Sequence, residues 1–258
     1  MRLDLADLPI ALINLPHQNR RRFRARRSMD RLGLPFTLIE GVRAKPRHFG
    51  CSQGHLRAIE AARGSGPFLI LEDDAIPTKH YMPHVDVPEG IDLLYLGHSP
   101  NGYSRRPQIG AVPDLTEPGP SGFLTVHSML AAHAILYVTE LGIEAVAQSI
   151  RHSIAADPQE RHDIGLCDLQ LRLRVAATAL PYFCQSGDLQ GDGKRDLRRL
   201  QEDFVSTPRA AGDLVATPGG ALSVARTASG RLGYVKDGPD MGALGGEASG
   251  EAVSARPD

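Results

Sequence analysis

The chain has 258 residues, of which 29 are lysine or arginine and 30 are aspartate or glutamate, so its net charge is close to zero. A globally basic nucleic-acid binder is therefore disfavoured. Hydrophobic residues make up 41% of the chain, which is typical of a folded globular protein. The cysteines Cys51, Cys167 and Cys184 have no CxxC spacing, which predicts reduced thiols and, for Cys51, a buried structural role. No targeting or bilayer-spanning segment is predicted, and we expect a cytoplasmic protein.

The first hundred residues predict strands that alternate with helices. An apolar run at residues 8–15 predicts a buried strand that ends at Pro16. The basic segment that follows predicts an amphipathic helix with Phe23, Met29 and Leu32 on its inner face and Gly33 as its C-terminal cap. Three more strands are expected, and Ser52 can cap a helix that ends near residue 63. The expected strands are residues 34–39, 68–71 and 91–96.

The second half of the chain is less regular. Residues 98–122 predict a long loop, and Thr139 is the expected cap of a helix that ends near residue 153. After about residue 205 glycine becomes frequent and Tyr234 is the last aromatic residue. We therefore predict an α/β domain over residues 1–205 and a mostly flexible tail over 206–258, with a hairpin around 222–235. The other expected elements are strands at 123–126, 134–138 and 176–180 and a helix at 163–174.

Three consecutive carboxylates, Glu72, Asp73 and Asp74, follow the strand predicted at residues 68–71. They repel one another unless a positive group joins them, and open α/β sheets bind ligands beyond the carboxyl ends of their strands. Strand alternation places Glu72 and Asp74 on one side and Asp73 on the other. Glu72 and Asp74 are therefore candidate ligands for Mg²⁺ or Mn²⁺, whose remaining positions would hold phosphate oxygens. The alternative is a solvated acidic turn.

Other candidate groups each have a structural alternative. The arginines of the segment Arg20–Arg27 form either a cationic face for an anionic partner or a solvated charged face. One or two of them, near the end of the first strand, could bind a diphosphate. His55 either donates to a substrate oxygen or caps a helix. Asp163 is a candidate base, metal ligand or helix cap, and Asp168 lies on the same predicted helix.

Taken in chain order, seven short motifs resemble glycosyltransferase family 25, which contains lipopolysaccharide-biosynthesis glycosyltransferases and relatives of the procollagen galactosyltransferases. The resemblance covers about residues 8–185. The motifs are Ile13-Asn14-Leu15, Arg21-Arg22, Leu32-Gly33-Leu34-Pro35-Phe36, Gly50-Cys51, His55-Leu56, Leu69-Ile70-Leu71-Glu72-Asp73-Asp74 and Leu94-Tyr95-Leu96-Gly97.

The resemblance implies a GT-A-like (Rossmann-like) mixed sheet flanked by helices, a UDP-sugar donor and a Mn²⁺ (or Mg²⁺) ion. It implies transfer of a hexose, galactose or glucose, with inversion, to a hydroxyl of a glycan or glycolipid acceptor such as lipopolysaccharide. The triplet Glu72, Asp73 and Asp74 stands at the family's acidic metal and nucleotide motif, and Arg21 and Arg22 stand at its arginine pair.

The resemblance also matches Asp163, followed by Pro181 and Gln185, to a later aspartate of the family. We expect Asp163 to be the catalytic base, with Asp168 as the second candidate. The expected donor-binding residues are Asn14, Arg21, Arg22, His55 and Asp73, and the expected metal ligands are Glu72 and Asp74.

Two hypotheses from other classes stay open. His17 stands where the family commonly has arginine, and Gly54 replaces a usual serine. The same scaffold is therefore alternatively a module that binds a nucleotide sugar without turnover. The segment Arg20–Arg27 predicts instead a protein that binds an anionic surface, or a transferase that docks peripherally on the inner face of an anionic membrane. No specific nucleic-acid partner is expected.

Overall fold

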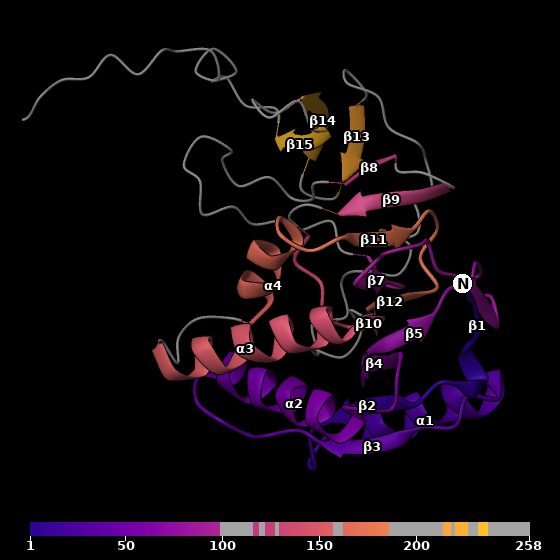
Figure 1. Cartoon of the computed structure of the whole chain (residues 1–258), viewed down its shortest axis with the longest axis vertical. Coiled ribbons are helices and arrows are strands. Elements are labelled where there is room, and N and C mark those ends of the chain that lie inside the picture. The colour runs from indigo at the N-terminus through magenta and orange to yellow at the C-terminus, as the bar shows by residue number, and fades with distance from the viewer. Residues whose placement is uncertain are drawn as a thin grey trace, which may run out of the picture.

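The computed structural model describes residues 1–98, 116–118, 122–126, 129–156, 162–185, 214–217, 220–226 and 232–236. Its centre is an eight-stranded sheet in the order β3-β2-β4-β10-β7-β11-β9-β8 (Figure 1). Strands β9 and β10 run antiparallel to the other six. The strands are β2 (Ile10–Asn14), β3 (Thr37–Glu40), β4 (Phe68–Glu72), β7 (Leu93–Tyr95), β8 (Thr116–Pro118), β9 (Phe123–Val126), β10 (Ala134–Tyr137) and β11 (Val175–Thr178).

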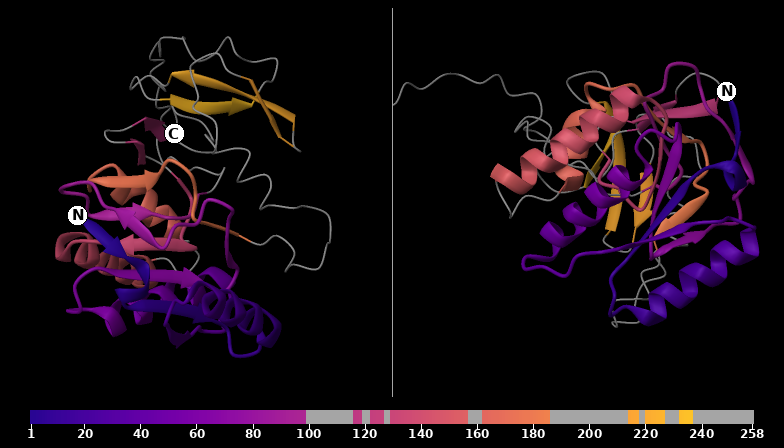
Figure 2. Two further views of the ribbon diagram at one scale, coloured as in Figure 1. Left: turned by 90° about the vertical axis from the view of Figure 1, so that its right-hand side faces the viewer. Right: turned by 60° about the horizontal axis from the view of Figure 1, so that its bottom comes forward.

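Helices cover both faces of this sheet, as predicted for an α/β fold (Figure 2, right). One face is covered by α2 (Arg47–Ala62), α3 (Glu140–Ala156) and α4 (His162–Gln170). The other face is covered by α1 (Asn19–Leu32), the short helix η1 (Leu5–Asp7) and two small sheets. The small sheets pair β1 (Arg2–Asp4) with β6 (His84–Asp86) and β5 (Ala75–Pro77) with β12 (Phe183–Gln185).

Strand alternation divides the core into two layers. Along β4, Phe68 and Ile70 pack with the layer of α2, α3 and α4, whereas Leu69 and Leu71 pack with the layer of α1. All four side chains are fully buried. A strand that is apolar on both faces is what a sheet covered on both sides requires, and this explains the continuous apolar run in the sequence. The same alternation places Glu72, the last residue of β4, on the side of Phe68 and Ile70.

Most of the long elements lie where the sequence predicts them. Gly33 caps α1 in the left-handed conformation, with φ of 67°, and Thr139 Oγ1 accepts from the backbone N–H of Gly142 at the start of α3. Two expectations are wrong. Helix α2 begins at Arg47 rather than at Ser52, so His55 lies in its middle. Phe23 is 67% exposed, and the buried residues of α1 are Ala25 and Met29.

The C-terminal part contains three described strands, which form a separate antiparallel sheet. The pairing of β14 with β15 confirms the predicted hairpin, and β13 extends it. The predicted loop at residues 98–122 and the proposed boundary at residue 205 lie mostly outside the described residues. The strands are β13 (Leu214–Thr217), β14 (Gly220–Arg226) and β15 (Leu232–Lys236).

Helix α4 is held against the sheet by a buried amide. Gln170 Nε2 donates to the Tyr95 hydroxyl at 2.9 Å and to the Met129 carbonyl at 2.8 Å, and Gln170 Oε1 accepts from the Met129 N–H at 2.7 Å. Gly165 lets α4 approach α3 closely, since an added Cβ would lie 2.6 Å from Ser149 Oγ. These contacts hold the end of α4 against the sheet and its middle against α3. Within the described part of the chain, no helix combines the length and apolar character needed to cross a bilayer.

Candidate functional site

The acidic triplet lies at the carboxyl end of β4, beside the end of β2, and is tied to both β2 and α1. Asp73 is buried, and its Oδ2 accepts a hydrogen bond from Asn14 Nδ2 at 2.6 Å. Its Oδ1 accepts from Arg21 Nη1 at 3.1 Å. Burial raises the pKa of Asp73, while Asn14 and Arg21 oppose this rise. The structure therefore brings together three of the five predicted donor-binding residues, Asn14, Arg21 and Asp73.

Asp74 is the least compensated member of the triplet. Its Oδ2 lies 3.8 Å from Arg21 Nη1, and its Oδ1 is buried without a hydrogen-bond partner among the described residues. Burial and the negative charge of Glu72 raise the pKa of Asp74 to about 8, although Arg21 opposes the rise. In the chain alone, Asp74 therefore holds a proton at neutral pH. Another positive charge at this position would favour its ionised form.

Glu72 faces the opposite layer from Asp73, as alternation predicts. The predicted grouping of Glu72 with Asp74 is wrong, because β4 ends at Glu72 and the turn that follows brings Asp74 with Asp73 to Arg21. Its Oε1 lies 2.9 Å from Nε2 of His55 on α2, and the ring of His55 packs against that of His162 with centroids 4.5 Å apart. Burial alone would raise the pKa of Glu72, but the hydrogen bond with His55 and the positive charge that His55 and His162 can carry lower it to about 2. His162, the first residue of α4, is a site residue to which the sequence analysis gives no role.

Two further histidines lie near the ends of neighbouring strands. His98 follows β7 and His133 precedes β10, where the His133 carbonyl accepts from the Glu72 N–H at 3.0 Å. Both side chains are buried, and burial lowers the pKa of His98 to about 3 and that of His133 to about 4. Both are therefore neutral at physiological pH. In the sequence, only their positions next to apolar strands indicate that His98 and His133 are buried.

The remaining predicted residues divide between the site and the surface. Asp163 is buried at the start of α4, and its charge acts on Cys51 together with those of the triplet. Asp168 lies five residues later, about 140° around the helix, so it does not share a face with Asp163. Arg22 is exposed and donates to Asn19 Oδ1 at 2.9 Å. No described contact links Arg22 to the triplet.

Cys51 differs from the expected buried structural cysteine, because its side chain is exposed. Cys51 precedes His55 by four residues on α2, so the two lie on the same side of that helix. Desolvation by neighbouring groups and the negative charges of Glu72, Asp74 and Asp163 raise its pKa to about 11. The thiol is therefore protonated at neutral pH and is a poor nucleophile.

The donor set fits a divalent cation. Glu72, Asp73, Asp74 and Asp163 bring four carboxylates to one end of the sheet, and Arg21 is the one arginine or lysine with a described contact to the triplet. Buried carboxylates without enough positive partners are costly. A cation would supply the missing positive charge at Asp74 Oδ1.

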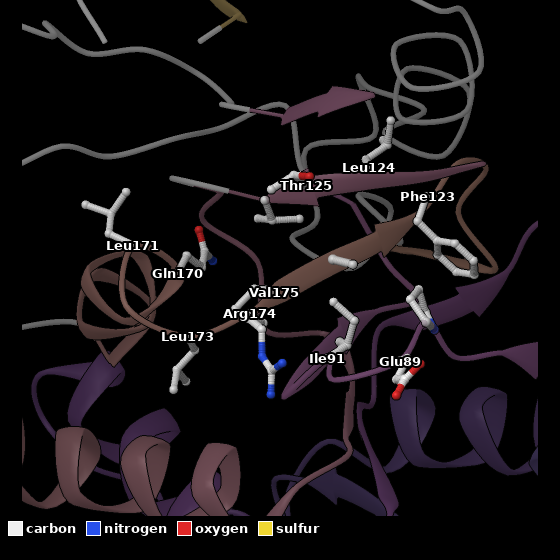
Figure 3. A pocket seen from close by; sticks show the side chains of 13 residues that line it. Glu89, Ile91, Phe123, Leu124, Thr125, Gln170, Leu171, Leu173, Arg174 and Val175 are labelled. Atoms are coloured by element: carbon white, nitrogen blue, oxygen red, sulfur yellow. The ribbon is translucent and has the colours of Figure 1, made fainter. Parts of the chain in front are cut away.

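A separate pocket of about 400 Å³ lies elsewhere on the sheet (Figure 3). It is lined mainly by apolar residues from β9, β11 and the segments that enter β7 and β11. Glu89 and Arg174 are the charged residues that line it. No residue of the triplet or of the surrounding histidines contributes to this pocket, so it is not part of the candidate site.

Comparison with solved structures finds 19 similar chains, which include the two described here. No family model and no curated protein matches the chain. A glycosyltransferase involved in the glycosylation of the major capsid of PBCV-1 is 11% identical, with a TM-score of 0.46, and the alignment covers 78% of this chain and 99% of that one. A nucleoside-diphosphate-sugar pyrophosphorylase from Vibrio cholerae RC9 is 11% identical, with a TM-score of 0.39 and coverage of 67% and 73%. Both TM-scores lie below 0.5, so these likenesses carry no argument about function, and membership of family 25 stays a prediction.

The raised pKa of Asp74 predicts how stability depends on pH when no divalent cation is present. The folded chain keeps the Asp74 proton up to about pH 8, whereas the unfolded chain loses it near pH 4. The unfolding free energy contributed by Asp74 therefore falls as pH rises between these values. We expect Asp74→Asn, which cannot ionise, to exceed the wild type in stability at pH 8 by at least about 1.4 kcal/mol, one pKa unit.

Urea denaturation in a chelating buffer, at about pH 5 and about pH 8, measures this difference. Asp86→Asn is the matched control, because Asp86 is exposed. A constant difference between Asp74→Asn and the wild type at both pH values would contradict the raised pKa.

Proposed function

We propose that this chain is a metal-dependent glycosyltransferase that moves a hexose, galactose or glucose, from a UDP-sugar to a hydroxyl of a glycan or glycolipid, with inversion at the anomeric carbon. The main support is the acidic triplet at the carboxyl end of β4, in which Asp73 is buried and Glu72 and Asp74 are partly buried, and which is joined to the end of β2 through Asn14 and Asp73. Such an edge of an α/β sheet is where ligands bind. An acidic turn in bulk solvent would not be buried in this way.

In the proposed donor site, a divalent ion would offset the negative charge of the acidic triplet that Arg21 alone leaves uncompensated. The divalent ion, Mn²⁺ or Mg²⁺, would be held by Glu72 and Asp74 and would supply Lewis-acid stabilisation of the leaving diphosphate. Arg21 is half-buried beside the triplet, and its planar guanidinium matches phosphate oxygens. Asn14 and Asp73 keep Arg21 at the carboxyl edge of the sheet.

The proposed reaction is a single displacement. The acceptor hydroxyl oxygen attacks the anomeric carbon and forms the new glycosidic bond, and the bond from that carbon to the diphosphate breaks with its electron pair on UDP. The acceptor proton passes to a carboxylate, for which Asp163 is the candidate because it is buried on the side of the triplet. The hydroxyl itself has too high a pKa to lose its proton unaided at neutral pH.

Two adjacent arginines test the donor site. Arg21→Gln should weaken binding of UDP-galactose or UDP-glucose about tenfold or more, because a hydrogen bond to a charged group contributes about 1.5–3 kcal/mol. Arg22→Gln removes the same charge from an exposed position and should leave affinity unchanged. Isothermal titration calorimetry with Mn²⁺ present measures both. Equal losses in the two variants would contradict a specific role for Arg21.

Two aspartates of α4 test the catalytic base. Asp163→Asn should lower kcat for sugar transfer by about 10²–10⁴-fold while donor affinity is retained, because only proton transfer is lost. Asp168→Asn changes a carboxylate on another side of the same helix and should transfer at the wild-type rate. If the wild type binds a UDP-sugar but never forms product with any glycan or glycolipid acceptor tested, the chain is instead a nucleotide-sugar-binding module.

Helix α1 supports peripheral contact with an anionic membrane at the cytoplasmic face. Its exposed face has six arginines, and Phe23 stands 67% exposed among them. A large exposed aromatic side chain ringed by cations suits the headgroup region of an anionic bilayer. The exposed arginines are Arg20, Arg22, Arg24, Arg26, Arg27 and Arg31.

Vesicle sedimentation tests this contact. The chain should bind vesicles that contain phosphatidylglycerol and should dissociate from them as the salt concentration is raised. It should not bind vesicles of pure phosphatidylcholine. Replacing Arg24 and Arg27 together by Gln should weaken binding about 30-fold, because each basic residue contributes about 1 kcal/mol. The matched control replaces Arg43 and Arg47, which are exposed outside α1. Equal binding by the two double variants would contradict a specific role for α1.

A further inference from the structure

We propose that His55, Glu72 and His162 form a site for a first-row divalent metal ion that accepts imidazole nitrogen, such as Zn²⁺, Co²⁺ or Mn²⁺. The three residues come from α2, β4 and α4, so the fold and not the sequence brings them together. The proposal deepens the proposed function, because it names nitrogen ligands for its cation beside Glu72. Its test, however, measures metal binding without any sugar nucleotide.

The spacing of the three side chains suits one ion. One possible ligand atom from each residue lies within 4.8 Å of the other two. His55 Nε2 and Glu72 Oε1 are 2.9 Å apart. Two ligands bonded to one ion at about 2.1 Å, and about 90–110° apart around it, are separated by about 3.0–3.4 Å. The observed pair is therefore already near the separation that a shared ion requires.

The burial of the two histidine rings also favours a bound metal ion, because solvent has little access to them. His55 is 1% exposed and His162 is 6% exposed, whereas the Glu72 side chain is 25% exposed. The site is thus closed on the side of the histidines and open on the side of the carboxylate. His55 Nδ1 is buried and lacks a hydrogen-bond partner among the described residues. Three protein ligands would leave coordination positions for water or a substrate oxygen.

The two rings are held in place before any ion binds. His55 lies in the middle of α2, and the next turn of this helix packs into the same core layer as β2 and β4 through Ala58 and Ile59. His162 begins α4, whose other end is fixed by the hydrogen bonds of Gln170 to Tyr95 and Met129. A preorganised ligand set costs little conformational entropy on binding.

The ligand types predict which ion binds. Two imidazole nitrogens and one carboxylate suit zinc-class ions, whereas Mg²⁺ prefers oxygen ligands and keeps several waters. For a nitrogen-containing site, affinity should follow Zn²⁺ above Co²⁺, Co²⁺ above Mn²⁺, and Mg²⁺ last. A site made only of the Glu72 and Asp74 carboxylates would prefer zinc-class ions over Mg²⁺ much less, because oxygen ligands also suit Mg²⁺.

The experiment is titration of the metal-free full chain with Co²⁺, followed by its visible absorption, and then competition with Zn²⁺ and Mg²⁺. His55→Asn and His162→Asn should each weaken Co²⁺ binding at least about tenfold, because mutation of even a residue that only orients a metal ligand costs about 10–100-fold in affinity. Asp74→Asn should weaken it less than either. His152→Asn, which changes an exposed histidine of α3, should bind like the wild type.

Several outcomes would overturn the proposal. They are the absence of Co²⁺ absorption, equal affinity for Mg²⁺ and Zn²⁺, or a greater loss in Asp74→Asn than in the histidine variants. In each case the contact between His55 and Glu72 would be a hydrogen bond only. If a histidine variant fails to fold, the order of affinities in the wild type still decides the question. Tight Co²⁺ binding without sugar transfer would contradict the transferase and leave the metal site intact.

Discussion

Three adjacent carboxylates at the end of a buried strand are the constraint on which the rest of the site depends. Their mutual repulsion must be offset, and the chain offsets it unequally: Arg21 and Asn14 stabilise Asp73, His55 stabilises Glu72, and Asp74 retains a proton. The two sides are separated by strand alternation, which turns Asp73 toward α1 and Glu72 toward α2. One short segment therefore connects both helical layers to a single edge of the sheet.

Much of the fold could be predicted because β4, β2 and β10 are apolar on both faces and are bounded by polar or turn residues. The short strands β5 and β12 could not, since each has three residues and forms only by pairing with the other. Helical spacing alone predicts Phe23 on the buried face of α1, but its side chain is exposed. The spacing of Ala25 and Met29 is equally helical, and only the position of α1 against the sheet decides which face is buried.

The acidic triplet and Arg21 could be identified from sequence because they are consecutive or lie just after the first strand. His55 could be identified as well, from the His55-Leu56 motif, but its pairing with Glu72 could not. His133 and His162 are separated from it by many residues, and the three meet only when α2, β10 and α4 surround Glu72. A single histidine in a sequence is usually a surface or core residue. Here the role of His55 depends on its contact with Glu72, which is more than fifteen positions away in the chain.

The protonation of Asp74 and the histidines around Glu72 both affect the net negative charge of the acidic triplet. A cation that binds beside Glu72 also stabilises the ionised form of Asp74, because the negative charge of Glu72 is the largest electrostatic cause of the raised pKa of Asp74. Metal binding and loss of the Asp74 proton are therefore coupled, and each favours the other. The ionised Asp74 then lies beside Arg21, so the charge of the ion also changes how firmly that arginine is held. In this way a cation on the α2 side of the sheet can influence Arg21 on the α1 side, the arginine proposed to bind phosphate.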